Sequence, residues 1–131
     1  MPVNDSGIMT FRAAGTVAAY RRVKFSGTNA VTSVVQSGAT GIDCGIALYA
    51  GATNDMISVA MLNKPGTLEV RGAATAPDYG AILYPAADGK LTATAATGLG
   101  IPTYVAIRAA SATGEVLEVV FRKFHSTATG Y

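Results

Sequence analysis

The sequence has 131 residues, of which 50% are hydrophobic and only 14% are charged, and its formal net charge is +2. A chain of this length fits one domain that buries a core without disulfides or metals, and its apolar content excludes a disordered chain. The small net charge gives no argument for nucleic-acid binding, no stretch is apolar enough to span a membrane, and the single Cys44 excludes an internal disulfide.

Residues 1–15 are polar and weakly patterned, and we predict an extended N-terminal arm there. From residue 16 onward, strand-like runs alternate with turn signals at short intervals, which is typical of an all-β protein. The pattern predicts a mainly antiparallel small barrel or sandwich over residues 16–125, followed by a C-terminal tail at 126–131. The predicted strands are 16–25, 30–36, 42–50, 56–62, 67–71, 81–84, 91–95, 103–109 and 115–122.

Alternation and turn chemistry support this reading at specific places. Leu117, Val119 and Phe121 share one face of the last predicted strand. Pro65-Gly66 suits a type II turn, because Pro fixes φ and Gly supplies a positive φ. Asp88-Gly89 lies between two apolar runs and is the strongest hairpin signal in the chain.

An internal repeat suggests that the domain contains two copies of one unit, near residues 20–62 and 79–122. The segment 41–50 aligns with 100–109, and one inserted residue later 55–61 aligns with 115–121. Further upstream, Phe25 aligns with Tyr84 and the pair 31–32 with 91–92. The arm at 1–15 has no counterpart in this alignment. Two such units predict a barrel or sandwich with pseudo-twofold character.

No residue pattern in the chain points to catalysis. The only histidine, His125, lies in the polar tail, far in sequence from Cys44, and no phosphate-binding, zinc or nucleophile motif is present. We therefore expect a protein that is not an enzyme and has no metal or cofactor. The N-terminus lacks the basic start and apolar run of a signal peptide, which predicts synthesis in a cytoplasm.

The basic residues near the N-terminus are candidates for contact with a neighbouring molecule. No acidic residue occurs from Ser6 to Ile42, whereas four basic ones do. A solvated strand face and a tail with incidental apolar residues are the alternatives to a contact surface. The candidate contact residues are Ile8, Met9, Phe11, Arg12, Arg21 and Arg22.

Several of these segments resemble the capsid decoration, or cement, proteins of tailed bacteriophages. In that family a strand of the Val-Gly-Ile-Ala type recurs, followed by an acidic turn and a Val-rich strand, with an Asp-Gly-Lys hairpin between the copies. The chain departs from the pattern at 79–81, where the family often has Gly-Asp. The stretches that carry the resemblance are 44–48 leading into 56–59, 65–70, 79–84 and 87–92, and 104–107 with 109–119.

The resemblance implies a virion protein that binds the outer surface of the assembled head and stabilises it by clamping neighbouring major capsid subunits. It also implies self-association, most simply into a homotrimer, and no nucleic-acid or membrane partner. The alternative is a β-rich module of a virion or cell surface that binds a carbohydrate or another ligand. That role needs an aromatic platform, which the scattered tyrosines do not mark in the sequence.

Overall fold

The computed structural model describes residues 6–26, 33–39, 42–73, 77–94, 101–108 and 114–124. Strands make up most of the elements in these ranges, so the predicted all-β fold is confirmed. The elements are β1 (Ile8–Ala13), β2 (Arg22–Ser26), β3 (Ser33–Gln36), β4 (Gly45–Ala47), β5 (Met56–Met61), β6 (Leu68–Arg71), β7 (Ile82–Pro85), the single 3-10 turn η1 (Ala87–Gly89), β8 (Leu91–Thr92), β9 (Pro102–Ala106) and β10 (Val116–Phe124).

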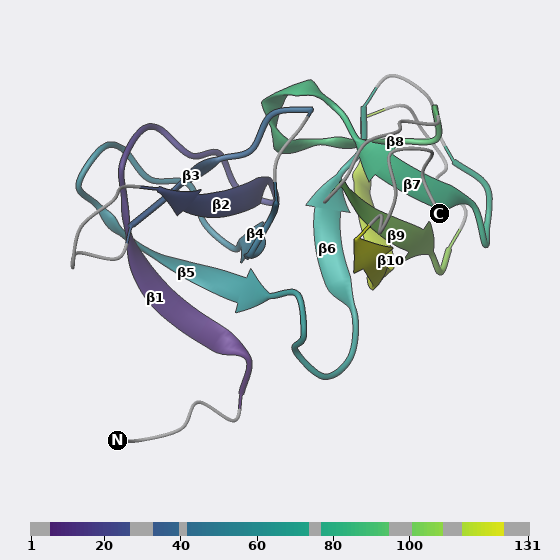
Figure 1. Cartoon of the computed structure of the whole chain (residues 1–131), viewed down its shortest axis with the longest axis horizontal. Helices are drawn as coiled ribbons and strands as arrows, with labels where there is room; N and C mark the ends of the chain where they lie inside the picture. The colour runs from purple at the N-terminus through teal and green to yellow at the C-terminus, as the bar shows by residue number, and fades with distance from the viewer. Residues whose placement is uncertain are drawn as a thin grey trace.

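The strands form two five-stranded lobes that lie side by side (Figure 1). In the first lobe the order β1-β3-β2-β4-β5 closes into a barrel, because β1 pairs with β5 antiparallel and with β3 in parallel. The second lobe is a sheet in the order β6-β10-β9-β7-β8. An isolated parallel bridge between Gly72 and Leu91 links the two ends of this sheet.

The strand pairings run the same way in both lobes. β2 pairs antiparallel with β3 and β4 as β7 does with β8 and β9, and β4 pairs with β5 as β9 does with β10. In register, Ala47 lies opposite Val59 in the first lobe, and Ala106 lies opposite Val119 in the second. The sequence alignment makes the same matches, with Ala47 and Ala106 in the alignment of 41–50 with 100–109, and Val59 and Val119 in that of 55–61 with 115–121.

Upstream of these strands the sequence alignment is out of register. Val23 lies opposite Gly45 and Leu83 lies opposite Tyr104, so Val23 of β2 corresponds to Leu83 of β7. The sequence match of Phe25 with Tyr84 is therefore shifted by one residue. The match of 31–32 with 91–92 falls on residues outside the described part of the chain. By strand pairing, β8 instead corresponds to residues within β3. The sequence alignment misses this correspondence because the connection between β7 and β8 is shorter than the one between β2 and β3.

The predicted arm is wrong for residues 8–13, which form β1 of the closed barrel. β1 pairs with β5 over five residues, and its Ala13 is fully buried. Its counterpart in the second lobe is β6. Arg12 near the end of β1 lies opposite Met56 of β5, and Arg71 at the end of β6 lies opposite Val116 of β10 in the same way. Residues 1–5 lie outside the described part of the chain.

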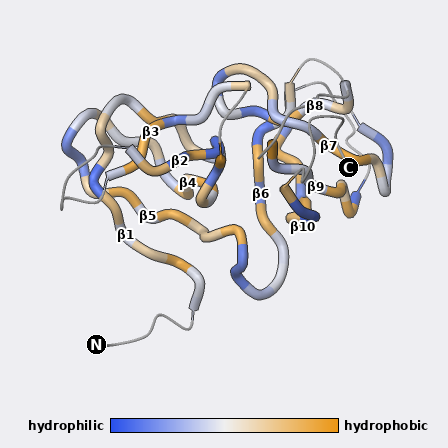
Figure 2. Tube along the Cα trace, viewed as in Figure 1, coloured by the Kyte–Doolittle hydropathy of each residue, from blue (hydrophilic) through white to orange (hydrophobic). Residues whose placement is uncertain are grey.

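Each lobe is filled by a cluster of small and medium apolar side chains. The first cluster includes Phe11, Val23 and Val59, and the second includes Leu83 and Tyr104. Figure 2 shows the hydrophobic residues concentrated along the strands and the hydrophilic ones in the connections. The second cluster extends across the junction between the two lobes, because it also contains Ile46 of β4 and Ala60 of β5 in the first lobe.

Two predicted turns are present. Asp88 and Gly89 both have positive φ, at 60° and 71°, and the Ala86 N–H donates to the Lys90 carbonyl at 2.9 Å. This is the tight hairpin turn between β7 and β8 that the Asp-Gly pair favours. Gly66 has a φ of 85°, as the Pro-Gly turn requires.

Candidate interaction surfaces

A buried cluster of polar side chains joins the two lobes. The Arg22 guanidinium of β2 donates to both carboxylate oxygens of Asp43, at 3.0 and 3.1 Å, and both side chains are fully buried. The Tyr104 hydroxyl of β9 donates to the same carboxylate at 2.9 Å. The other guanidinium nitrogens donate to the carbonyls of Gly38, Ala86 and Lys90 at 2.7 to 3.0 Å. Every charged group of the cluster is thus paired, as burial requires.

This cluster corrects one predicted contact residue and constrains another. Arg22 has no exposed surface, so it is not available to a neighbouring molecule, and that prediction is wrong. Its neighbour Arg21 is half-buried and donates to the Asp88 carbonyl at 2.7 Å. Both arginines therefore hold the β7–β8 hairpin of the second lobe against β2 of the first.

The predicted contact residues of the N-terminal segment separate into two groups. Ile8 and Met9 are each 39% exposed at the start of β1. Phe11 is 6% exposed and belongs to the barrel core, so its predicted contact role is wrong. Arg12 is half-buried, next to the parallel pairing of β1 with β3. Because Phe11 and Arg22 are buried, the six predicted residues do not form one contact surface.

A shallow apolar groove crosses from the first lobe to β10. It has a volume of about 380 Å³ and is lined by Phe25, Ile42, Cys44, Met61, Leu62, Phe121 and Phe124, among others. Phe25 is 55% exposed and Ile42 is 64% exposed. Large apolar side chains gathered on an accessible surface are typical of protein contact sites.

Sequence reasoning missed this apolar groove, although the repeat contained one sign of it. Met61 ends β5 opposite Gly45, and Phe121 occupies the matching place in β10 opposite Tyr104. Both line the groove, so equivalent positions of the two copies face the same surface. Nothing in the sequence indicates that Phe25 is exposed. Alternation along a strand places it on the same face as Val23, two residues earlier, and Val23 is fully buried.

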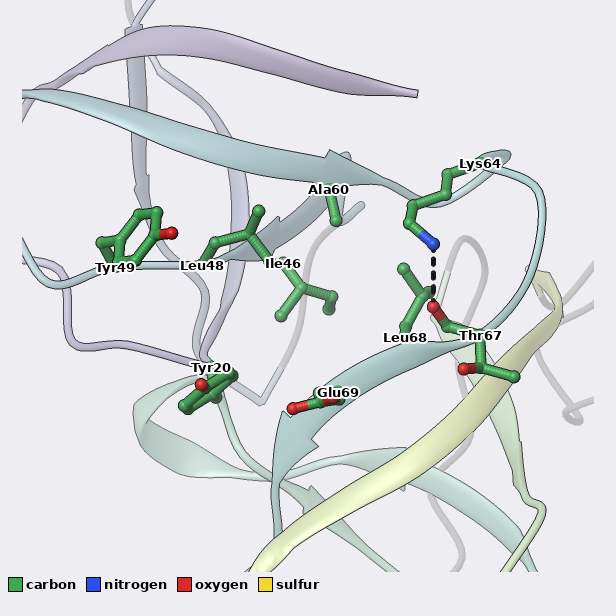
Figure 3. Close-up of a pocket in the computed structure, with 9 residues that line it drawn as sticks. All are labelled: Tyr20, Ile46, Leu48, Tyr49, Ala60, Lys64, Thr67, Leu68 and Glu69. Atoms are coloured by element: carbon green, nitrogen blue, oxygen red, sulfur yellow. Dashed lines mark hydrogen bonds between the residues drawn. The ribbon is translucent and has the colours of Figure 1, made fainter. Parts of the chain in front are cut away.

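A second groove of mixed character lies between β4 and β5 of the first lobe and β6 of the second. Its volume is about 280 Å³. Figure 3 shows an apolar lining from Ile46, Leu48, Ala60 and Leu68, with polar side chains around it. The polar lining residues are Tyr20, Tyr49, Lys64, Thr67 and Glu69. The structure thus brings two tyrosines to one site, whereas in the sequence they are scattered.

Two ionisable groups near the junction, Cys44 and Tyr104, are held in their neutral forms. Burial, with a smaller effect from the Asp43 charge, raises the pKa of the Cys44 thiol to about 12. Burial also raises the pKa of Tyr104 well above its usual value, and the Asp43 charge adds to this effect. A thiol with a raised pKa is a poor nucleophile at neutral pH. In the described ranges no three His, Cys, Asp or Glu side chains are grouped so as to hold a metal ion.

No helix in the described part of the chain is long and apolar enough to cross a membrane.

The comparisons with known proteins find a shared fold. No protein-family model and no curated protein sequence matches the chain. The chain is similar to a solved structure, that of the N base of the head fiber gp8.5 in bacteriophage phi29, with a TM-score of 0.69. The similarity covers 95% of this chain and 96% of the other, at 20% sequence identity. The two chains therefore share one fold over nearly their whole lengths.

Proposed function

We propose that the chain is a non-enzymatic structural protein of a bacteriophage virion, attached to the outer surface of the head. The observation that carries this proposal is the fold shared along nearly the whole length of both chains with the base of a phage head fiber. The resemblance to decoration proteins points the same way, and it is carried by segments 44–48, 56–59, 65–70, 79–84, 87–92, 104–107 and 109–119. In this proposal the protein is made in the host cytoplasm and joins the virion during assembly.

We also propose that the protein binds the assembled shell and stabilises it by clamping neighbouring major capsid subunits. The apolar groove supports this role, because Phe25 and Ile42 offer exposed apolar surface to a partner. Ile8 and Met9 offer a second, smaller contact at the start of β1. Binding that selects the assembled shell stabilises it by mass action, and several contacts per oligomer reinforce one another.

Co-sedimentation with emptied heads of the phage that encodes the protein tests this function. The wild-type protein is expected to sediment with the shells and to raise the temperature at which they break. The double variant Phe25→Ser, Ile42→Ser is expected to bind at least about tenfold more weakly, a loss of about 1.4 kcal/mol. The matched control is Tyr79→Ser, because Tyr79 is also exposed but does not line the groove. Wild-type protein that does not sediment with the shells contradicts the proposal.

Self-association into a homotrimer is the remaining part of the proposal. The low charge of the chain and its exposed apolar side chains support it. Sedimentation equilibrium of the free protein and cross-linking of the shell-bound protein are expected to give a trimer. A monomer in both settings contradicts the trimer and leaves shell binding to be judged by the co-sedimentation result.

A further inference from the structure

The mixed groove between the lobes is slightly smaller than an ordinary ligand pocket, but it combines an apolar lining with polar side chains as such pockets do. Its volume of about 280 Å³ lies just below the roughly 300–1,000 Å³ of ordinary ligand pockets. Ile46, Ala60 and Leu68 in its lining are each at most 3% exposed, so they belong to the packed core. The shape of the groove is therefore fixed by the fold of both lobes.

The backbone of Tyr20 is held in an unusual conformation at one end of the groove. Its φ is 60°, in the left-handed region that bulky residues rarely adopt. Its N–H donates to the Ala47 carbonyl and its own carbonyl accepts from the Arg71 N–H, both at 2.8 Å. One bond goes to each lobe. Strain that is held in place in this way is typical of ligand-binding sites.

Tyr49 lies at the same end of the groove as Tyr20 (Figure 3). Its side chain is 66% exposed, although it lines the groove. An exposed ring beside an apolar floor offers a flat surface for a ligand, and its hydroxyl remains able to form hydrogen bonds. Tyr20, which is half-buried, and Tyr49 thus both line this end of the groove, although they are scattered in the sequence.

One charge of each sign lies among the groove residues. Lys64 donates through its ammonium to the carbonyls of Pro65 and Thr67, at 2.9 and 3.1 Å, and these partners are uncharged. Glu69 is exposed and makes no salt bridge with any other described residue, whereas Glu118 opposite it on β10 pairs with Arg108. The groove therefore carries no net charge. Because the two charges oppose each other, the groove as a whole favours neither a cation nor an anion.

We propose that this groove binds one ring of a neutral sugar. A sugar ring has an apolar C–H face that fits against the exposed Tyr49 ring and the half-buried Leu48. Its hydroxyl groups are able to donate to Glu69 and accept from Lys64. A neutral ligand with both properties is the one that this combination of an exposed tyrosine, an apolar lining and balanced charges suits best. The proposal does not rest on attachment to a phage head, because the groove is complete in the isolated chain.

Titration of the full-length, isotope-labelled protein with glucose, galactose and N-acetylglucosamine tests the proposal by NMR. At least one of these sugars is expected to shift resonances of Tyr20, Tyr49 and Glu69. Tyr49→Ala and Glu69→Gln are each expected to weaken binding by roughly three- to tenfold. Tyr79→Ala is the matched control, since it removes an exposed tyrosine outside the groove and is expected to leave the affinity unchanged.

Three results overturn the proposal. The first is that none of the three sugars shifts the groove resonances. The second is that a sugar binds but both groove variants keep wild-type affinity while retaining their fold by NMR, which places the site elsewhere. The third is that L-arginine methyl ester shifts the groove resonances and the sugars do not, which identifies the occupant as a cationic side chain of a protein partner.

Discussion

The ion pair between Arg22 and Asp43 is fully buried, and its energetic value depends on both partners being present. Burying two charges costs several kcal/mol, and the pair offsets this cost only through close geometry and complete hydrogen bonding. Here the guanidinium has partners in both lobes, and Asp43 also accepts from the Tyr104 hydroxyl. Removing one partner leaves an uncompensated buried charge at the junction.

Arg22→Met is therefore expected to destabilise the protein by about 3–5 kcal/mol. Chemical denaturation followed by circular dichroism measures this loss. Arg108→Met is the matched control, because the side chain of Arg108 is 70% exposed in its ion pair with Glu118. An exposed pair contributes at most about 1 kcal/mol. Equal losses for the two variants would contradict the role assigned to Arg22.

Stability is expected to fall as the pH rises above about 9, because the folded protein holds the protons of Cys44 and Tyr104 more tightly than the unfolded chain. Both groups have raised pKa values in the folded state, that of Cys44 being about 12. Their contribution is complete below the unfolded pKa values and is lost as the pH rises toward the folded ones. Urea denaturation at several pH values from 7 to above 9 measures the slope.

The variant Cys44→Ala, Tyr104→Phe tests this assignment, because it removes both titrating groups. Its stability is expected to change less with pH above about 9 than that of the wild type, whatever its stability at neutral pH. An unchanged slope would show that the alkaline loss comes from other groups.

At the scale of elements, β1 shows why one strand escaped detection in the sequence. Ile8 and Met9 are consecutive apolar residues that are both partly exposed, so the period-two alternation of a half-buried strand is missing there. The partners of β1 are β3 and β5, which lie far along the chain, and a local pattern does not report such pairings. Its counterpart β6 was predicted, because Leu68 and Val70 alternate with exposed or half-buried polar residues.

Phe11→Ala tests whether β1 belongs to the barrel. Phe11 is 6% exposed, so its truncation is expected to cost about 3–5 kcal/mol. Met9→Ala on the same strand is the control, because Met9 is 39% exposed. Its truncation is expected to cost less than about 1 kcal/mol. Thermal or urea denaturation measures both, and a small effect of Phe11→Ala would restore the interpretation of this segment as an arm.

The turn between β7 and β8 gives a test of how the lobes pack. An added Cβ at Gly89 would lie 2.9 Å from Arg21 Cβ and 3.1 Å from the Arg22 carbonyl oxygen. Gly80 has a similar φ of 78° and no atom within 4 Å of such a Cβ. Gly80→Ala therefore reports the backbone cost alone, about 1–2 kcal/mol.

Gly89→Ala is expected to cost about 1–3 kcal/mol more than Gly80→Ala, because the extra methyl group pushes the hairpin away from β2. Denaturation curves of the two variants give the difference. Equal costs would mean that the hairpin moves away from the first lobe without loss of stability.

At the scale of the whole molecule, local patterns were enough for nine of the ten strands in the described part of the chain, since each predicted strand overlaps an observed one. The repeat also predicted that β4 and β5 are equivalent to β9 and β10, and the matching registers of the two pairs agree with this. The junction was beyond sequence reasoning. Arg21 and Arg22 look alike in the sequence, and only the packing of the lobes decides which one is buried. Both grooves lie at that junction and were missed for the same reason.

Because the lobes share a core and a buried polar cluster, we expect neither to fold alone. Ile46 and Ala60 of the first lobe pack in the apolar cluster of the second, and Asp43 is the acceptor for Tyr104. A separate second lobe would have only about 65 residues, a size at which a single core is marginal. It would also expose the face of Leu68 that the first lobe covers.

Fragments 1–64 and 65–131 test this expectation, because the division falls in the exposed connection between β5 and β6. Each fragment alone is expected to give the circular dichroism of an unfolded chain, and an equimolar mixture is expected to recover the β-sheet spectrum with a midpoint that depends on concentration. A division between Ala52 and Thr53, in the exposed turn before β5, is the control, since it separates β5 from the rest of its barrel and is expected to recover less. Cooperative unfolding of fragment 65–131 by itself would show that the second lobe is an independent domain, which folds without its contacts to the first lobe.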